Sequence, residues 1–205
     1  GKTVHVWTTF SEDQVDLNFH SAGVFVKVLD VLLFYVSKGA RYIRLDAIAF
    51  IWKQLGTSCM HLPQAHKIIQ LYRHFIDQVA PGVVIITETN VPHEENVSYF
   101  GDGTNEAHMV YNFTLPPLVM HSLHKQSVCE LTRWAKTLQL PSDQVCFFNF
   151  TASHDGGGVR PLQGIVSDAA VEELASLARA HGGFVSMRDN GDGTQSPYEV
   201  NCNYF

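Results

Sequence analysis

Three carboxylates follow three apolar stretches that have the length of β-strands. Asp46 ends the stretch Tyr-Ile-Arg-Leu-Asp, Glu88 ends a run of valines and isoleucines, and Asp155 follows a third apolar stretch. The acids are 42 and 67 residues apart, which places them on strands n, n+1 and n+3 of a chain with regular strand–helix units. The carboxyl ends of barrel strands open onto one face, so the three acids are predicted to converge there.

A pair of carboxylates at such a face is what glycoside transfer requires, because one attacks and the other protonates the leaving oxygen. Arg44 and Asp46 point to the same side of a strand, and a guanidinium favours the ionised carboxylate that a nucleophile needs. Burial behind an apolar strand favours the protonated form of Glu88, as in a general acid. Asp155, with His154 beside it, could bind sugar hydroxyls. Taken alone, Arg44 and Asp46 are better explained as a structural ion pair at a strand end, and it is the other two acids that favour a catalytic role.

The elements that must position these acids alternate along the chain. Apolar residues recur at helical spacing in four segments, and shorter apolar runs predict four strands. Such alternation is typical of parallel strands joined by right-handed helical crossovers. We expect a polar loop over 90–107 and a flexible turn over 156–161. The helices are expected over 24–36, 64–79, 115–138 and 168–181, and the strands over 42–46, 83–88, 109–113 and 145–150.

The composition is that of an ordinary globular protein, with 45% hydrophobic residues, 17% charged residues and a net charge of −6. No basic stripe indicates nucleic-acid binding, and the apolar runs are too short to span a bilayer. No signal peptide is visible, and four cysteines without CxxC spacing favour reduced thiols in a cytoplasmic protein. The histidines form no HExxH pattern, so no metal site is predicted.

The residues around the three acids resemble conserved regions of the α-amylase superfamily, glycoside hydrolase family 13. The resemblance implies an α/β fold of the (β/α)8 barrel type and double displacement with retention of configuration. Asp46 would form a β-glucosyl-enzyme intermediate, Glu88 would act as acid and then base, and Asp155 would stabilise the transition state. No cofactor takes part in that chemistry. The matching stretches are Arg44-Leu-Asp46, Thr87-Glu88, His154-Asp155 and Gln14-Val-Asp16-Leu-Asn18.

More narrowly, the chain is similar to the sucrose phosphorylase branch, in which phosphate intercepts the intermediate and gives α-glucose 1-phosphate. Phe50 stands where sucrose phosphorylases carry a tyrosine, and Glu199 replaces a glutamine. The stretch around Arg160 looks more like glucosylglycerate phosphorylases, and an arginine can hold an acidic acceptor bidentately. We therefore expect glucosylglycerate ahead of sucrose, although Arg160 could also point into solvent. The expected substrate-binding residues are Arg44, Phe50, His121, His154, Arg160, Tyr198 and Glu199.

The resemblance places residues 1–165 in the central part of a barrel, about strands 4–7 with their helices. Residues 166–205 would be an irregular insertion after strand seven that carries the acceptor-site loop. Strands one to three and strand eight would then be absent, so activity is expected of a parent protein and not of these 205 residues alone. The expected partners are an α-glucoside and inorganic phosphate, with no nucleic acid, no membrane and a possible homodimer. Two alternatives stay open: a hydrolase or transglucosidase of the same superfamily, and a non-catalytic amylase-like barrel.

Overall fold

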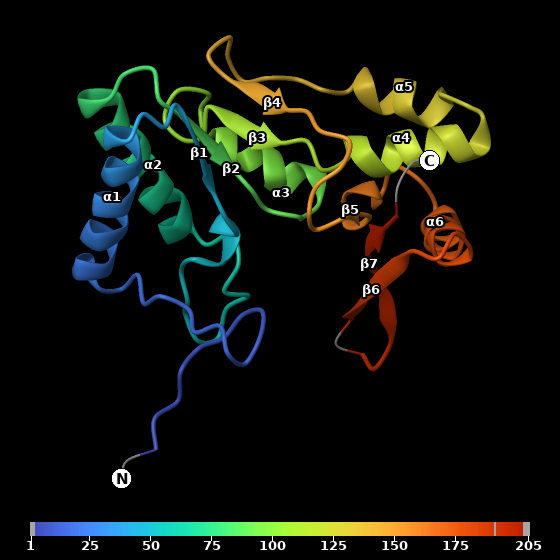
Figure 1. Cartoon of the computed structure of the whole chain (residues 1–205), viewed down its shortest axis with the longest axis horizontal. Coiled ribbons are helices and arrows are strands. Elements are labelled where there is room, and N and C mark those ends of the chain that lie inside the picture. Colours follow the sequence, from blue (N-terminus) through green and yellow to red (C-terminus); the bar gives the residue numbers. More distant parts are fainter. Residues whose placement is uncertain (1–2, 191, 203–205) are drawn as a thin grey trace. The chain divides into compact units, whose positions relative to one another are not determined.

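The chain folds into two compact units, here described from a computed structural model that covers residues 3–190 and 192–202 (Figure 1). The first unit comprises Gly1–Thr89 with Tyr99–Met109, and the second comprises Asn90–Ser98 with Val110–Phe205. Each unit has its own buried apolar cluster. The two units are therefore described one after the other.

The first unit is built on two parallel strands, β1 (Tyr42–Leu45) and β2 (Val84–Thr87). Their register places Arg44 beside Ile86 and Leu45 beside Thr87. His108, just before β3 (Met109–Tyr111), extends this arrangement, since its backbone N–H donates to the carbonyl of Ile85 at 3.0 Å. The predicted strand–helix alternation with parallel pairing is thus confirmed for this unit.

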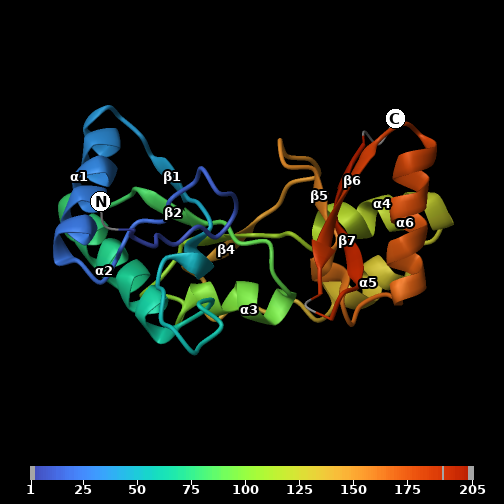
Figure 2. The ribbon, with the colours of Figure 1, turned by 90° about the horizontal axis from the view of Figure 1, so that it is seen from below.

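Two helices lie side by side in the first unit, α1 (Ala22–Ser37) and α2 (Pro63–Val79), as Figures 1 and 2 show. Their apolar stripes meet where Phe25 stacks on Tyr72 with ring centroids 4.7 Å apart. Gly39 follows α1 with φ +93°, a backbone conformation that favours glycine and ends the helix as predicted. The buried cluster of this unit comprises Leu32, Ile43, Ile68, Tyr72, Ile76, Val83 and Ile85.

The second unit contains three main helices, α4 (Leu115–Lys125), α5 (Cys129–Ala135) and α6 (Asp168–Ala180), and the strand β4 (Cys146–Phe148). The end of β3 meets β4 where the N–H of Asn112 donates to the carbonyl of Phe148 at 3.0 Å. The buried cluster lies among the three helices and the C-terminal strands and comprises Leu118, Met120, Trp134, Val159, Leu162, Leu174, Ala175, Ala178, Val185 and Val200.

The C-terminal part is more regular than the sequence predicted. An antiparallel sheet has the strand order β5-β7-β6, with β5 at Gly157–Gly158, β6 at Phe184–Asp189 and β7 at Gln195–Asn201. Val185 and Val200 pair across it and are buried, which anchors the hairpin on the core of the second unit. The prediction of a flexible turn over 156–161 is partly wrong, because β5 and a short 3-10 helix at Arg160–Leu162 lie in this segment.

Two further expectations are corrected. The single helix predicted over 115–138 is two helices, because Gln126 takes a left-handed conformation with φ 51° and ends α4. The expected polar loop 90–107 contains α3 (His93–Val97) and a 3-10 turn at Ser98–Phe100. Glu94 and Glu95 lie in the first turn of α3, where acidic side chains stabilise a helix, and Asn96 is buried with its amide donating to the carbonyl of Tyr111 at 2.7 Å.

Candidate active site

Arg44 and Asp46 form the predicted ion pair at the carboxyl end of β1. Their side chains point to the same side, as alternation along a strand requires, and Nη1 of Arg44 lies 2.5 Å from Oδ1 of Asp46. The Asp46 side chain keeps 68% of its surface exposed, whereas Arg44 keeps 31%. The carboxylate is therefore held from one side by a cation and is accessible from the other.

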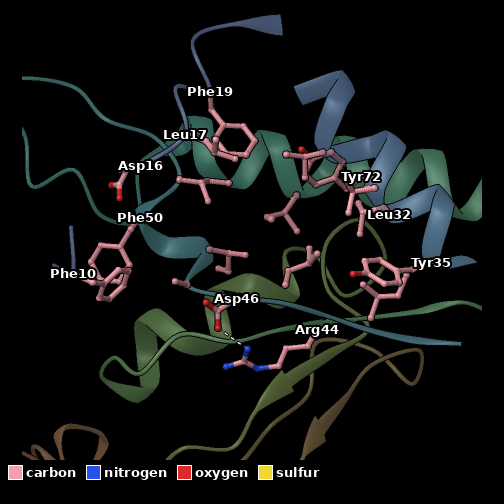
Figure 3. Close-up of a pocket in the computed structure, with 18 residues that line it drawn as sticks. Phe10, Asp16, Leu17, Phe19, Leu32, Tyr35, Arg44, Asp46, Phe50 and Tyr72 are labelled. Atoms are coloured by element: carbon pink, nitrogen blue, oxygen red, sulfur yellow. Dashed lines mark ion pairs between the residues drawn. The ribbon is translucent and has the colours of Figure 1, made fainter. Parts of the chain in front are cut away.

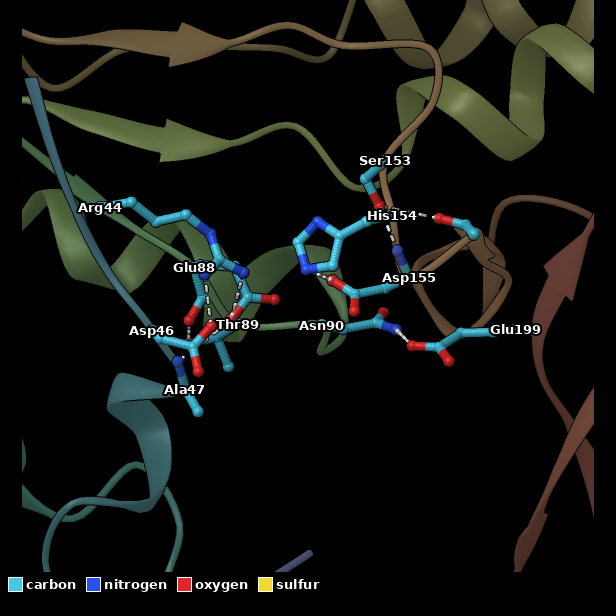
Figure 4. Close-up of polar contacts among 11 residues, drawn as sticks. Arg44, Asp46, Ala47, Glu88, Thr89, Asn90, Ser153, His154, Asp155 and Glu199 are labelled. Atoms are coloured by element: carbon cyan, nitrogen blue, oxygen red, sulfur yellow. Dashed lines mark hydrogen bonds and ion pairs between the residues drawn. The ribbon is translucent and has the colours of Figure 1, made fainter.

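Glu88 follows β2 directly and meets the same guanidinium. Its Oε2 lies 3.6 Å from Nη2 of Arg44 and accepts a hydrogen bond from the backbone N–H of Ala47 at 3.1 Å (Figure 4). The backbone N–H of Glu88 donates to the carbonyl of Leu45 at 3.0 Å, which continues the pairing of the two strands. Its side chain is 13% exposed and thus largely buried, and its role as the general acid stays a prediction. One arginine thus joins both acids at the carboxyl ends of neighbouring parallel strands.

Ala47 connects the two acids through its backbone. It has φ 49° and ψ 36°, a left-handed conformation that costs an L-residue about 1–2 kcal/mol. In this conformation the N–H of Ala47 points at the Glu88 carboxylate. Because Ala47 directly follows Asp46 in the chain, this hydrogen bond links the segment of one acid to the side chain of the other. Strained residues of this kind concentrate at functional sites, and here the strain sits between the candidate nucleophile and the candidate acid.

A cavity of about 390 Å³ lies beside β1 in the first unit (Figure 3). Its walls are mostly apolar, with Leu32 and Tyr72 from the two helices, and its charged lining is limited to Asp16, Arg44 and Asp46. A buried sugar needs partners for its hydroxyls, and this lining offers few of them beyond its three charged residues. Phe50 lies in its wall and packs edge-on against Phe10 at 5.3 Å, and its substrate-binding role stays a prediction.

Asp16 belongs to the motif Gln14-Val-Asp16-Leu-Asn18 and is tied into the first unit. Lys53 Nζ lies 2.7 Å from its Oδ2, and the N–H of Thr9 donates to Oδ1 at 3.3 Å. Burial alone would raise the pKa of Asp16, but the hydrogen bonds from Lys53 and Thr9 outweigh it and hold that pKa below its ordinary value. Asp16 therefore anchors the N-terminal segment as an ionised group.

Asp155 and His154 lie in the second unit, in the loop between β4 and β5. Nε2 of His154 is 3.2 Å from Oδ2 of Asp155, and the Asp155 N–H donates to Oγ of Ser153 at 3.2 Å (Figure 4). Both side chains are exposed, with 78% and 51% of their surfaces accessible. Their contacts leave Asp155 accessible to a ligand. The convergence of Asp155 with Asp46 and Glu88 stays a prediction.

Glu199 lies on β7 and contacts a residue that the sequence did not single out. Nδ2 of Asn90 donates to Oε1 of Glu199 at 3.3 Å (Figure 4). Oγ of Ser186 donates to Oε2 of Glu199 at 3.4 Å. Burial and the nearby charge of Asp155 raise the pKa of Glu199. The hydrogen bonds from Asn90 and Ser186 lower that pKa, but they do not cancel the rise. Gly158, opposite Glu199 in the sheet, leaves room for Asn90, since a Cβ there would collide with the Asn90 amide.

Asn90 could have been noticed from its place two residues after Glu88. Its contact with Glu199 spans 109 residues, however, and no local pattern indicates it. Both residues belong to the second unit.

The remaining predicted binding residues are also in the second unit. Arg160 and Tyr198 line a polar cavity of about 330 Å³. His121 is buried in α4 at 7% exposure, and its Nδ1 has no hydrogen-bond partner within the described part of the chain. The substrate-binding roles of Arg160, Tyr198, Glu199, His154 and His121 stay predictions. Of the insertion expected over 166–205, residues 191 and 203–205 lie outside the described ranges.

Three other sequence expectations concern metals, thiols and membranes. Among residues 3–190 and 192–202, no group of three or more His, Cys, Asp or Glu side chains is arranged to hold a metal ion. The cysteines at 59, 129, 146 and 202 are all described, and each is a free thiol. None of the helices in the described ranges combines the length and apolar character that crossing a bilayer requires.

The comparisons with known proteins define the class. Residues 3–176 match the family described as "Alpha amylase, catalytic domain", so the chain belongs to the α-amylase family. The structure is similar to the crystal structure of sucrose 6F-phosphate phosphorylase from Thermoanaerobacter thermosaccharolyticum, with a TM-score of 0.80 and 25% identity. The match covers 97% of this chain and 39% of that one. The predicted α/β fold, as part of an amylase-type catalytic barrel, is confirmed.

Two curated relatives are more specific. The chain is 55% identical over 203 residues to the glucosylglycerate phosphorylase of Escherichia coli (strain K12), which covers 99% of this chain and 36% of that protein. It is 50% identical over 202 residues to the glucosylglycerate phosphorylase of Spirochaeta thermophila, covering 98% of this chain and 34% of that protein. The chain thus spans about a third of the length of these relatives.

Proposed function

We propose that the full-length protein is a retaining glycoside phosphorylase. It cleaves an α-glucoside with inorganic phosphate and releases α-glucose 1-phosphate, with glucosylglycerate as the favoured substrate and sucrose next. The observation that carries the proposal is the single guanidinium of Arg44 between Asp46 and Glu88. The identity to glucosylglycerate phosphorylases over almost the whole chain supports the substrate.

The proposed mechanism has two displacements. In the first, a carboxylate oxygen of Asp46 attacks the anomeric carbon, and the bond to the glycosidic oxygen breaks as protonated Glu88 gives that oxygen its proton. In the second, a phosphate oxygen attacks the anomeric carbon and the bond to Asp46 breaks, while Glu88 takes up the proton from the incoming group. Two inversions give net retention.

The arrangement around Arg44 suits the short spacing between the two acids that these roles require. Retention requires the two carboxyl groups to be about 5 to 5.5 Å apart, and contact with one guanidinium keeps both acids close together. The accessible Asp46 oxygens can reach a sugar, whereas Glu88 is mostly buried. Asp155 would stabilise the positive charge that develops on the sugar ring, and this role rests on the family resemblance.

Product analysis tests the proposal. Purified full-length protein is incubated with glucosylglycerate, with and without phosphate, and sugars are separated by chromatography. We expect α-glucose 1-phosphate only when phosphate is present, and little free glucose in either case. Free glucose released at equal rates in both reactions would instead make the protein a hydrolase of the same family. No conversion of glucosylglycerate, sucrose or related α-glucosides would favour a non-catalytic amylase-like barrel.

A further inference from the structure

The polar cavity of the second unit has two arginines in its lining, of which sequence reasoning found only one. Arg160 comes from the 3-10 helix that follows β5, and Arg188 comes from β6, where it pairs with Ser196 of β7. Tyr198, on the same strand as Ser196, completes this side of the cavity. The volume, about 330 Å³, suits a small molecule.

Arg160 is an incompletely satisfied cation. It is half-buried, and its Nε is enclosed without a hydrogen-bond partner among the described residues. Burial lowers the pKa of Arg160, and the like charge of Arg188 lowers it further, while Tyr198 and Glu95 act in the opposite direction. A buried donor without an acceptor is costly unless a ligand supplies one. The guanidinium is therefore placed to receive an anionic group.

Arg188 adds a second cation. Within the ranges that the structure describes, neither Arg188 nor Arg160 forms an ion pair with a carboxylate. One carboxylate, Asp168, does line the cavity, but it lies in the first turn of α6, where the helix N-terminus stabilises negative charge. Two guanidinium groups against one carboxylate leave the lining with a net positive charge.

We propose that Arg188, together with Arg160, binds an oxyanion of a small substrate in this cavity. This inference rests on the proposed function, which supplies two such oxyanions: the carboxylate of an acidic acceptor such as glycerate, and the phosphoryl group of phosphate or α-glucose 1-phosphate. The planar fork of a guanidinium matches both groups. Arg188 is thereby a specificity-determining residue.

The test compares charged and neutral acceptors on full-length protein. The reaction is run from α-glucose 1-phosphate to glycerate or to glycerol, which keeps the hydroxyls but lacks the carboxylate. For Arg188→Ala, we expect the KM for glycerate to rise about 10-fold or more, with the rate on glycerol changed less than about 2-fold. Arg188→Lys should recover part of the loss, because a lysine keeps the charge without the fork. Arg133→Ala, at an exposed arginine of α5, is the matched control.

The outcomes separate the inference from the proposed function. A higher KM for α-glucose 1-phosphate and phosphate, with glycerate unaffected, would support the oxyanion site and assign it to the phosphoryl group. Unchanged KM values for glycerate, phosphate and α-glucose 1-phosphate in Arg188→Ala would overturn the inference, provided that the wild type is an active phosphorylase. A wild-type protein without phosphorylase activity would instead refute the proposed function.

Discussion

The guanidinium of Arg44 lies 3.6 Å from the carboxylate of Glu88, which directly follows the strand next to its own. The same guanidinium holds Asp46, so one side chain sets the positions of both acids that the proposed chemistry needs. Parallel pairing of β1 with β2 makes this possible, because it brings the carboxyl ends of both strands to one edge.

Arg44→Lys should impair catalysis more than folding. A lysine carries the charge but has no planar fork, so it cannot hold the two carboxylates in the same fixed geometry. We expect kcat on glucosylglycerate to fall about 100-fold, the effect of displacing a catalytic group by about 1 Å, with little change in the melting temperature. Arg41→Lys, at an exposed position just before β1, is the control and should keep full activity. Equal effects of the two substitutions would argue against the bridging role.

The left-handed conformation of Ala47 gives a prediction about stability. Ala47→Gly should raise the free energy of unfolding by about 1 kcal/mol, because glycine adopts this conformation without the penalty of a Cβ. Ala47→Val should lower it and reduce kcat as well, since a β-branched residue resists a positive φ and the Glu88 contact depends on it. Urea unfolding of the full-length protein measures both. An Ala47→Gly variant less stable than the Ala47→Val variant would contradict the assigned backbone conformation.

Gly158→Ala should disturb the contact between Asn90 and Glu199. The added methyl group would collide with the Asn90 amide, which must then move away from the Glu199 carboxylate. If this pair belongs to the acceptor site, the KM for glycerate should rise about 10-fold, as expected when a hydrogen bond to a charged group is lost. Gly157→Ala, at the neighbouring position of β5, provides a comparison, because a Cβ there meets only Val200, at ordinary contact distances of 3.5 Å or more. Unaltered acceptor kinetics in Gly158→Ala would remove Asn90 and Glu199 from the site.

The raised pKa of Glu199 predicts a pH dependence of stability. The folded protein holds this proton more tightly than the unfolded chain, whose value is near 4.5. The resulting stabilisation is complete below that value and is lost as the pH rises through the raised folded-state pKa. Glu199→Gln cannot ionise, so its stability relative to wild type should increase from about pH 4 to about pH 7.

Thermal unfolding across this pH range measures the effect in both proteins. The same measurement on Glu172→Gln, at an exposed position of α6, should follow the wild type. A difference between Glu199→Gln and wild type that stays constant with pH would mean that Glu199 is not the group responsible.

Local patterns in the sequence predicted the elements whose apolar residues repeat regularly. The period of α1 and α2, the valine and isoleucine run of β2, and the same-side placement of Arg44 and Asp46 all follow from backbone geometry. The break between α4 and α5 was missed because Gln126 is neither glycine nor proline. The hairpin of β6 and β7 was missed because most of its residues are polar, so the sequence shows no apolar alternation around Val185 and Val200, the two buried valines that anchor it.

The site was predicted where it depends on strand ends and missed where it depends on distant contacts. Asp46 and Glu88 follow their strands directly, so their meeting required only parallel pairing. Asn90 meets Glu199 across 109 residues, and Arg188 and Arg160 reach one cavity from different elements, so no spacing rule marks either arrangement.

The most direct measurement is identification of the residue that carries the sugar. Full-length protein is incubated with a 2-deoxy-2-fluoro-α-glucosyl fluoride, digested, and analysed by mass spectrometry of its peptides, with Asp46→Asn as the control. The anomeric fluoride leaves without needing a proton from Glu88. The fluorine at C2 slows hydrolysis or phosphorolysis of the covalent glycosyl-enzyme intermediate, so the intermediate accumulates. We predict one fluoroglucosyl group on Asp46 and none in Asp46→Asn. A label on another residue, or an unlabelled enzyme that still turns over glucosylglycerate with inversion, would contradict Asp46 as the nucleophile.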